Sequence, residues 1–76
     1  MELEGVLNAY RADLTRRQIE VLMACARALP PGDWEGVVEL VLLAQALARS
    51  DTRRSDLAAR THALRTRPFA HLLVSL

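Results

Sequence analysis

Residues 34–49 read WEGVVELVLLAQALAR and are the most hydrophobic stretch of the chain. They contain no proline, and their leucine and alanine content favours a helix. Apolar side chains would occur on nearly every side of this helix, and the polar strip consists of Glu35, Glu39 and Gln45. A helix that is apolar all round is normally enclosed by other elements. We therefore predict that a helix over about 34–49 lies at the centre of an all-α fold.

Two further helices are predicted upstream of this run. Apolar positions in residues 2–13 recur at helical spacing. Thr15, followed by Gln18 three positions later, has the spacing of a capping box, which starts a new helix. We therefore predict one helix over 2–13 and a second over 16–29. One continuous helix over 2–29 is the alternative, because no glycine or proline separates the two segments.

Turn and capping residues mark the remaining boundaries. The proline-proline-glycine sequence at 30–32 ends the second helix, and Asp33 is suited to the N-cap of the third. Residues 50–52 read SDT and can cap a fourth helix that runs to about residue 66. A proline in the first turn favours a short final helix over 68–75. The sequence therefore predicts a small bundle of four short helices, with the last segment as a short fifth.

The length of the chain limits how much apolar surface it can bury. It has 76 residues, of which 51% are hydrophobic, and we expect a single helical domain over residues 1–76. A domain of this size buries only about 60–65% of the surface that its unfolded chain exposes, and leftover apolar patches usually mark interfaces. We therefore expect a protein–protein interaction or oligomerisation module, with a homodimer or another protein as partner. The expected interface residues are Trp34, Val38, Val41, Leu42, Phe69, Leu72 and Leu73.

This hypothesis leaves two placements open. Trp34 either caps the core where the helices over 16–29 and 34–49 meet, or anchors an interface, since tryptophan is frequent among residues that dominate binding energy. The segment from Phe69 to Leu76 either folds back on the core or reaches across to another subunit. We also expect that full enclosure of the 34–49 helix takes a second copy or a partner.

Charge is distributed unevenly between the two parts of the chain. Residues 1–48 carry four arginines and seven acidic residues, a net charge of −3, whereas residues 49–76 carry six arginines and two acidic residues, a net charge of +4. Clustered cations suit phosphate binding, so a small nucleic-acid-binding or transcription-associated protein is the alternative function. We favour pairing of acidic with basic helices, because Asp51 and Asp56 interrupt the basic run and no aromatic residue lies within it to stack on bases. The candidate nucleic-acid-binding residues are Arg49, Arg53, Arg54, Arg60, Arg65 and Arg67.

One phrase in the predicted second helix resembles a DNA-binding family. Residues 14–22 read LTRRQIEVL, which is similar to the Leu-Thr-x-Arg-x-x-x-Val-Leu opening of the helix-turn-helix domain of quorum-sensing-type response regulators. The family then turns through a glycine into a polar recognition helix. This chain continues instead with the turn at 30–32 and its most hydrophobic helix, which could not lie in a major groove. The capping box explains the phrase, and the family's function is not transferred.

The sequence contains no familiar catalytic or metal-binding motif. Cys25 is the only cysteine, which excludes an intramolecular disulfide, and its apolar neighbours predict a small hydrophobic side chain rather than a nucleophile. His62 and His71 lie on different predicted helices and lack a third ligand for zinc. Glu35 and Glu39 are interpreted as solvent-facing carboxylates. We therefore expect no enzyme activity, no cofactor, no metal and no small-molecule substrate.

Location is inferred from signals that the sequence lacks. The N-terminal residues are acidic and do not show the basic start and apolar run of a signal peptide. The longest apolar stretch is shorter than the 18 or more residues that span a bilayer. The single cysteine fits a reducing compartment, so we expect a cytoplasmic protein without membrane contact.

Overall fold

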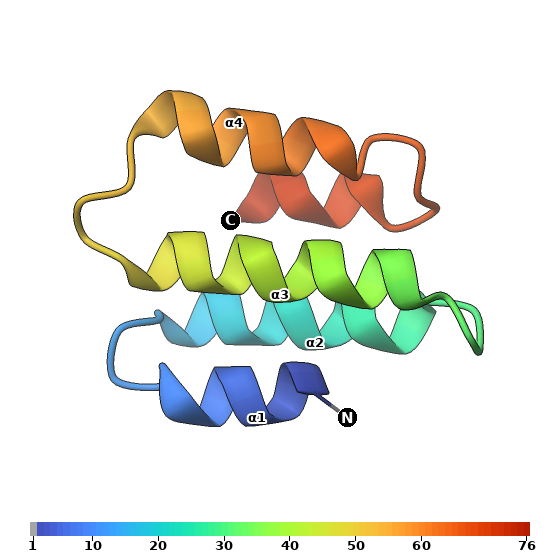
Figure 1. Cartoon of the computed structure of the whole chain (residues 1–76), viewed down its shortest axis with the longest axis horizontal. Helices are drawn as coiled ribbons and strands as arrows, with labels where there is room; N and C mark the ends of the chain where they lie inside the picture. The colour runs from blue at the N-terminus through green and yellow to red at the C-terminus, as the bar shows by residue number, and fades with distance from the viewer. Residues whose placement is uncertain (1) are drawn as a thin grey trace.

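The computed structural model describes residues 2–76 and confirms the predicted all-α fold (Figure 1). Four α-helices are followed by a short 3₁₀-helix near the C-terminus, and no strand occurs in the described residues. The elements are α1 (Glu2–Ala9), α2 (Arg16–Ala28), α3 (Trp34–Ala48), α4 (Arg54–Ala63) and η1 (Ala70–Ser75).

The bundle has two layers. In Figure 1, α3 lies in the middle of the nearer layer, between α1 and α4, and it contacts both. The second layer contains α2 and η1, which pack against each other behind α3. Because α2 also contacts α1 and α3, the predicted position of α3 at the centre of the bundle is confirmed.

All elements except α4 contribute buried side chains to one hydrophobic core. Leu40, Leu43 and Ala44 of α3 lie at its centre and are almost completely inaccessible to solvent. Around them pack side chains from the other helices and from the loops that connect them: Leu3, Leu7, Leu14, Val21, Leu22, Cys25, Ala26, Leu64, Phe69 and Leu73. Such a core holds the fold together mainly by removing apolar surface from water.

The break between the first two helices is confirmed. Thr15 is the N-cap of α2, and its hydroxyl accepts a hydrogen bond from the Gln18 backbone N–H at 3.0 Å, while the Thr15 N–H donates to Gln18 Oε1 at 2.9 Å. The predicted end of the first helix was wrong by four residues, because α1 stops at Ala9. A turn follows, in which the Asp13 N–H donates to the Tyr10 carbonyl at 2.8 Å.

The predicted cap of the fourth helix was also wrong. Arg53 occupies the N-cap position of α4 and makes no side-chain capping hydrogen bond, and residues 50–52 stay in the connection between α3 and α4. The Asp51 carboxylate pairs there with the Arg49 guanidinium, with Oδ1 and Nε 3.4 Å apart. At its other end α4 stops at Ala63, three residues earlier than predicted.

The chain encloses α3 more completely than we expected. Over residues 37–48 only Val38 is classed as exposed, and every other side chain is buried or half-buried. Full enclosure is still not reached within the chain, so the expectation that it takes a second copy or a partner stays a prediction. The reason is geometric, since α1, α2 and α4 cover three sides of α3 and leave a narrow outward strip.

Candidate interaction surface

The outward strip of α3 carries large apolar side chains in contact with solvent. Trp34 is 67% exposed and Val38 is 50% exposed, and Leu42, one further turn along, is half-buried. Their spacing of four residues aligns them along one side of the helix. We call Trp34, Val38 and Leu42 the α3 face. Three of the seven expected interface residues therefore lie together on one accessible strip.

Trp34 does not cap the core. The close contact between the end of α2 and the first turn of α3 is made by Gly36, which is buried. A Cβ atom at Gly36 would lie 2.5 Å from Leu29 Cδ2, so any larger residue there would force the Leu29 side chain to shift. Since Gly36 occupies the core side of this turn, Trp34 points to solvent. Of the two placements considered for it, the structure excludes the core cap.

The other four expected interface residues are not on the α3 face. Phe69 and Leu73 are 1% and 4% exposed and belong to the core, which removes them from any interface of the folded chain. Leu72 and Val41 are half-buried and pack against the core. The C-terminal segment folds back because η1 packs on α2.

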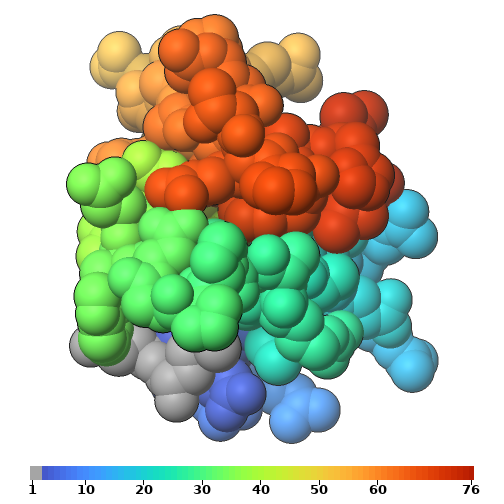
Figure 2. All heavy atoms as spheres, turned by 90° about the vertical axis from the view of Figure 1, so that its right-hand side faces the viewer, coloured from blue at the N-terminus to red at the C-terminus, as the bar shows by residue number. Residues whose placement is uncertain are grey.

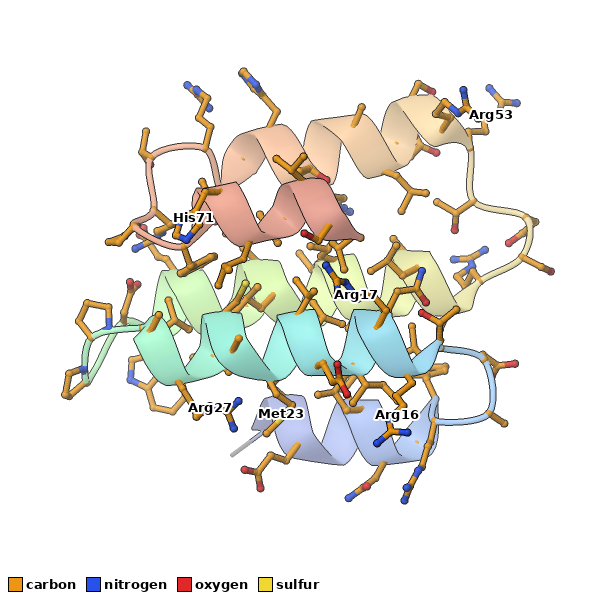
Figure 3. The ribbon with its side chains drawn as sticks, turned by 180° about the vertical axis from the view of Figure 1, so that it is seen from behind. Arg16, Arg17, Met23, Arg27, Arg53 and His71 are labelled. Atoms are coloured by element: carbon orange, nitrogen blue, oxygen red, sulfur yellow. The ribbon has the colours of Figure 1, made fainter. Side chains whose placement is uncertain are left out.

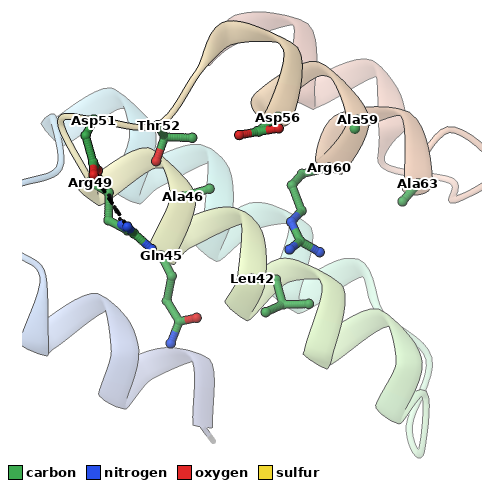
Figure 4. A pocket seen from close by; sticks show the side chains of 10 residues that line it. All are labelled: Leu42, Gln45, Ala46, Arg49, Asp51, Thr52, Asp56, Ala59, Arg60 and Ala63. Atoms are coloured by element: carbon green, nitrogen blue, oxygen red, sulfur yellow. Dashed lines mark hydrogen bonds and ion pairs between the residues drawn. The ribbon is translucent and has the colours of Figure 1, made fainter.

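A groove runs beside the α3 face, between α3 and α4 (Figure 4). Its volume is about 520 Å³. Figure 4 shows the Arg60 side chain extending from α4 toward Leu42 of α3, and the Arg49–Asp51 ion pair at the far end. The remaining lining residues are Gln45, Ala46, Thr52, Asp56, Ala59 and Ala63. Both charge signs therefore border the α3 face.

A second groove, which sequence analysis did not find, lies between α1 and α2. Its volume is about 750 Å³, and Leu7, Leu14, Ile19 and Met23 supply apolar lining. Figure 3 shows Met23 extending from α2 toward α1. Its polar residues are Glu4, Asn8, Arg11, Arg16 and Glu20, of which Arg16 and Glu20 form an exposed ion pair. The sequence could not predict this groove, because it is marked by the partial exposure of Ile19 and Met23. Helical periodicity identifies apolar positions but does not separate half-buried from buried ones.

The arginines of the basic segment lie on several elements and have different partners. Arg67 makes a partly buried ion pair with Asp33, which joins the α2–α3 turn to the loop before η1 at the end of the bundle seen in Figure 2. Arg49 pairs with Asp51, and Arg65 donates to the His62 carbonyl at 3.0 Å. Arg60 borders the α3–α4 groove, and Arg53 and Arg54 lie at the exposed start of α4. Phosphate recognition needs several cations on one face, and nucleic-acid binding by these arginines stays a prediction.

Cys25 is buried in the core, where its thiol is shielded from water. Burial removes water from around the thiol and raises its pKa from 9.0 to about 11. Both histidines are exposed, and His71 Nδ1 lies 3.1 Å from the Pro68 carbonyl oxygen. The prediction that Cys25 behaves as a small hydrophobic side chain is confirmed. Among residues 2–76, no three His, Cys, Asp or Glu side chains are close enough to hold a metal ion.

The thiol should react slowly with disulfide reagents in the folded protein. With a pKa of about 11, only about one thiol in a thousand is ionised at pH 8, and it is also shielded from the reagent. We expect labelling by a chromogenic disulfide to be at least about a hundredfold slower in buffer than in concentrated guanidinium chloride. Labelling at equal rates in the two conditions would show that Cys25 is accessible.

Burial of the neutral thiol also makes stability depend on pH. The unfolded chain ionises Cys25 near its ordinary value of 9.0, whereas the folded chain does so near 11, so this contribution to stability is intact below pH 9 and is lost between pH 9 and pH 11. A Cys25→Ala variant lacks this term and should lose less stability over that interval.

No helix in residues 2–76 combines the length and the apolar character that crossing a bilayer requires. The chain matches no family model, no curated protein and no solved structure. Function is therefore inferred from the surface of this chain alone.

Proposed function

We propose that this chain functions by protein–protein association, and that it associates with a second copy of itself through the α3 face. The observation that carries the proposal is the exposure of Trp34 and Val38 on the central helix. Tryptophan is enriched among the residues that dominate binding energy at protein interfaces. No reaction is part of the proposal.

The dimensions of the molecule support the same conclusion. Its broad side, which contains α1, α3 and α4, measures 31 Å by 25 Å, and its depth is 18 Å. A standard interface buries about 800 Å² on each partner, which a side of this size can supply. The α3 face lies on the middle helix of this side, between α1 and α4, with Trp34 at the N-terminal end of that helix.

The test is to remove the α3 face without disturbing the core. A Trp34→Ala, Val38→Ser double variant should raise the dissociation constant of the dimer at least about thirtyfold, since a tryptophan that dominates binding at an interface commonly contributes about 2 kcal/mol or more. The solution mass should be measured by light scattering over a range of concentrations. Val74→Ser is the matched control, because Val74 is 87% exposed on η1, away from the α3 face.

Either of two results would overturn the proposal. One is a wild-type chain that stays monomeric at about 100 μM, a concentration that reveals any micromolar dissociation constant. The other is a double variant that associates as well as Val74→Ser does. Circular dichroism should show that both variants keep the helical fold, as expected for exposed positions.

A binding experiment with a DNA duplex tests the alternative function. Fluorescence anisotropy of a labelled duplex at about 50 mM salt, where phosphate contacts are strongest, should show no binding. Binding that weakens steeply with added salt, and that is lost in a combined Arg53, Arg54 and Arg60 to Gln variant, would favour the alternative function.

A further inference from the structure

Three residues along the edge of the α3 face are spaced in a way that specifies a geometry. Glu35, Leu42 and Arg49 are separated by seven residues each, which is two helical turns less about 20°. They therefore lie in one line along α3, with an acidic residue at the start, an apolar residue in the middle and a basic residue at the end. Glu35 and Arg49 are both exposed.

This order of charges is self-complementary only in an antiparallel pair. A two-fold axis at Leu42 exchanges residue positions equally distant from it, so Glu35 of one copy lies opposite Arg49 of the other, and the contact occurs twice. A parallel pair would instead bring each Glu35 level with the other Glu35 and each Arg49 level with the other Arg49. Like charges in contact are unfavourable.

The apolar residues fit the same axis. Leu42 meets Leu42 of the second copy, and Val38 lies opposite Ala46, a small residue that lines the adjoining groove. Trp34 reaches the end of the second copy's α3. Val38 thus faces a small residue and Trp34 faces the end of a helix, so neither side chain meets a bulky one across the axis.

The charges around this line permit the new contacts. Arg49 pairs within its own chain with Asp51, but both side chains are largely exposed and their closest atoms are 3.4 Å apart, so the pair contributes little. Glu35 has no ion-pair partner within residues 2–76. The edge of α4 that borders the groove carries one acidic and one basic residue, Asp56 and Arg60. When the α4 helices of two copies meet, they therefore do not bring together charges of a single sign.

We propose that two copies of this chain pair α3 against α3 in antiparallel orientation about a two-fold axis at Leu42, with Glu35 of each copy bound to Arg49 of the other. This inference rests on the proposed self-association and adds its geometry. A different protein as the occupant of the α3 face is an outcome that the test distinguishes.

The test exchanges the charges. Glu35→Arg places arginine opposite arginine at both contacts, and Arg49→Glu places glutamate opposite glutamate. Each variant alone should raise the dissociation constant of its homodimer about tenfold or more, since two favourable contacts become unfavourable. An equimolar mixture of the two variants should form a heterodimer with an affinity within about threefold of the wild-type dimer, because every contact then joins opposite charges.

Glu20→Arg is the matched control for the charge change. Glu20 is exposed on α2, and its substitution should leave the dissociation constant unchanged. Analytical ultracentrifugation measures all the dissociation constants, and circular dichroism checks that each variant is folded.

The outcomes separate the two proposals. If each charge variant associates as well as Glu20→Arg, or if the mixture does not recover affinity, the antiparallel arrangement is wrong. Self-association through the α3 face still stands in that case, provided that the Trp34→Ala, Val38→Ser variant dissociates. A wild-type chain that remains monomeric overturns both proposals and leaves a different protein as the partner.

Discussion

Replacing Phe69 with alanine is expected to destabilise the chain by about 3–5 kcal/mol, because the substitution leaves a large cavity in a closely packed core. Phe69 is 1% exposed and is the largest of the fully buried side chains. A chain of 76 residues has a total stability of about 4–11 kcal/mol, so the variant should lose a large part of it and unfold at a lower urea concentration than the wild-type chain. Urea unfolding followed by circular dichroism measures the loss.

The same experiment decides between the two placements considered for the C-terminal segment. If Phe69 lay at an interface, Phe69→Ala would weaken association and leave the unfolding free energy of the monomer unchanged. Val74→Ala, on the exposed side of η1, serves as the control and should change the unfolding free energy by less than about 0.5 kcal/mol.

Replacing Asp33 with alanine is expected to destabilise the chain by about 2–3 kcal/mol. Asp33 Oδ1 accepts a hydrogen bond from the Gly36 N–H at 3.0 Å and caps α3, a contribution of about 1 kcal/mol. Its second oxygen binds Arg67, and the two side chains are only 15% and 22% exposed. Removal of the carboxylate leaves a half-buried guanidinium without its counter-charge, which adds to the loss.

Asparagine at this position separates the two contributions. Asp33→Asn keeps an N-cap acceptor and removes the charge, so it should lose only the ion-pair part. Arg67→Gln, and the double variant with Asp33→Asn, complete a double-mutant cycle measured by urea unfolding. A coupling energy near zero would show that the ion pair does not hold the α2–α3 turn to the loop before η1.

The starts of α2 and α3 were predictable because the signals that set them are local. The Thr15 and Gln18 side chains bond to each other's backbone across three residues, and the Asp33 cap reaches only to Gly36. Such contacts form in the helix itself, without help from the rest of the fold. The start of α4 was predicted wrongly because it has no such local signal: Arg53 is the N-cap residue and makes no side-chain capping hydrogen bond.

The candidate surface was only partly predictable. Trp34, Val38 and Leu42 were expected at an interface and do lie on one accessible strip, but Phe69 and Leu73 were assigned to the same interface and are core residues. Hydrophobicity identifies a side chain that avoids water without saying whether its own chain or a partner covers it. For α3, coverage depends on where α1, α2 and α4 pack, and for Phe69 it depends on the return of η1 onto α2.

The amino-acid sequence by itself determined the all-α class, the order of the helices, the two capped helix starts and the central position of the most hydrophobic helix. These properties follow from periodicity, capping and turn residues, which act over one or two helical turns. Only the tertiary structure decided that the chain encloses most of α3, that Gly36 rather than Trp34 faces Leu29, and that Arg67 is bound to Asp33. Those facts depend on contacts between residues distant in the sequence, whose geometry is fixed only when the helices pack together.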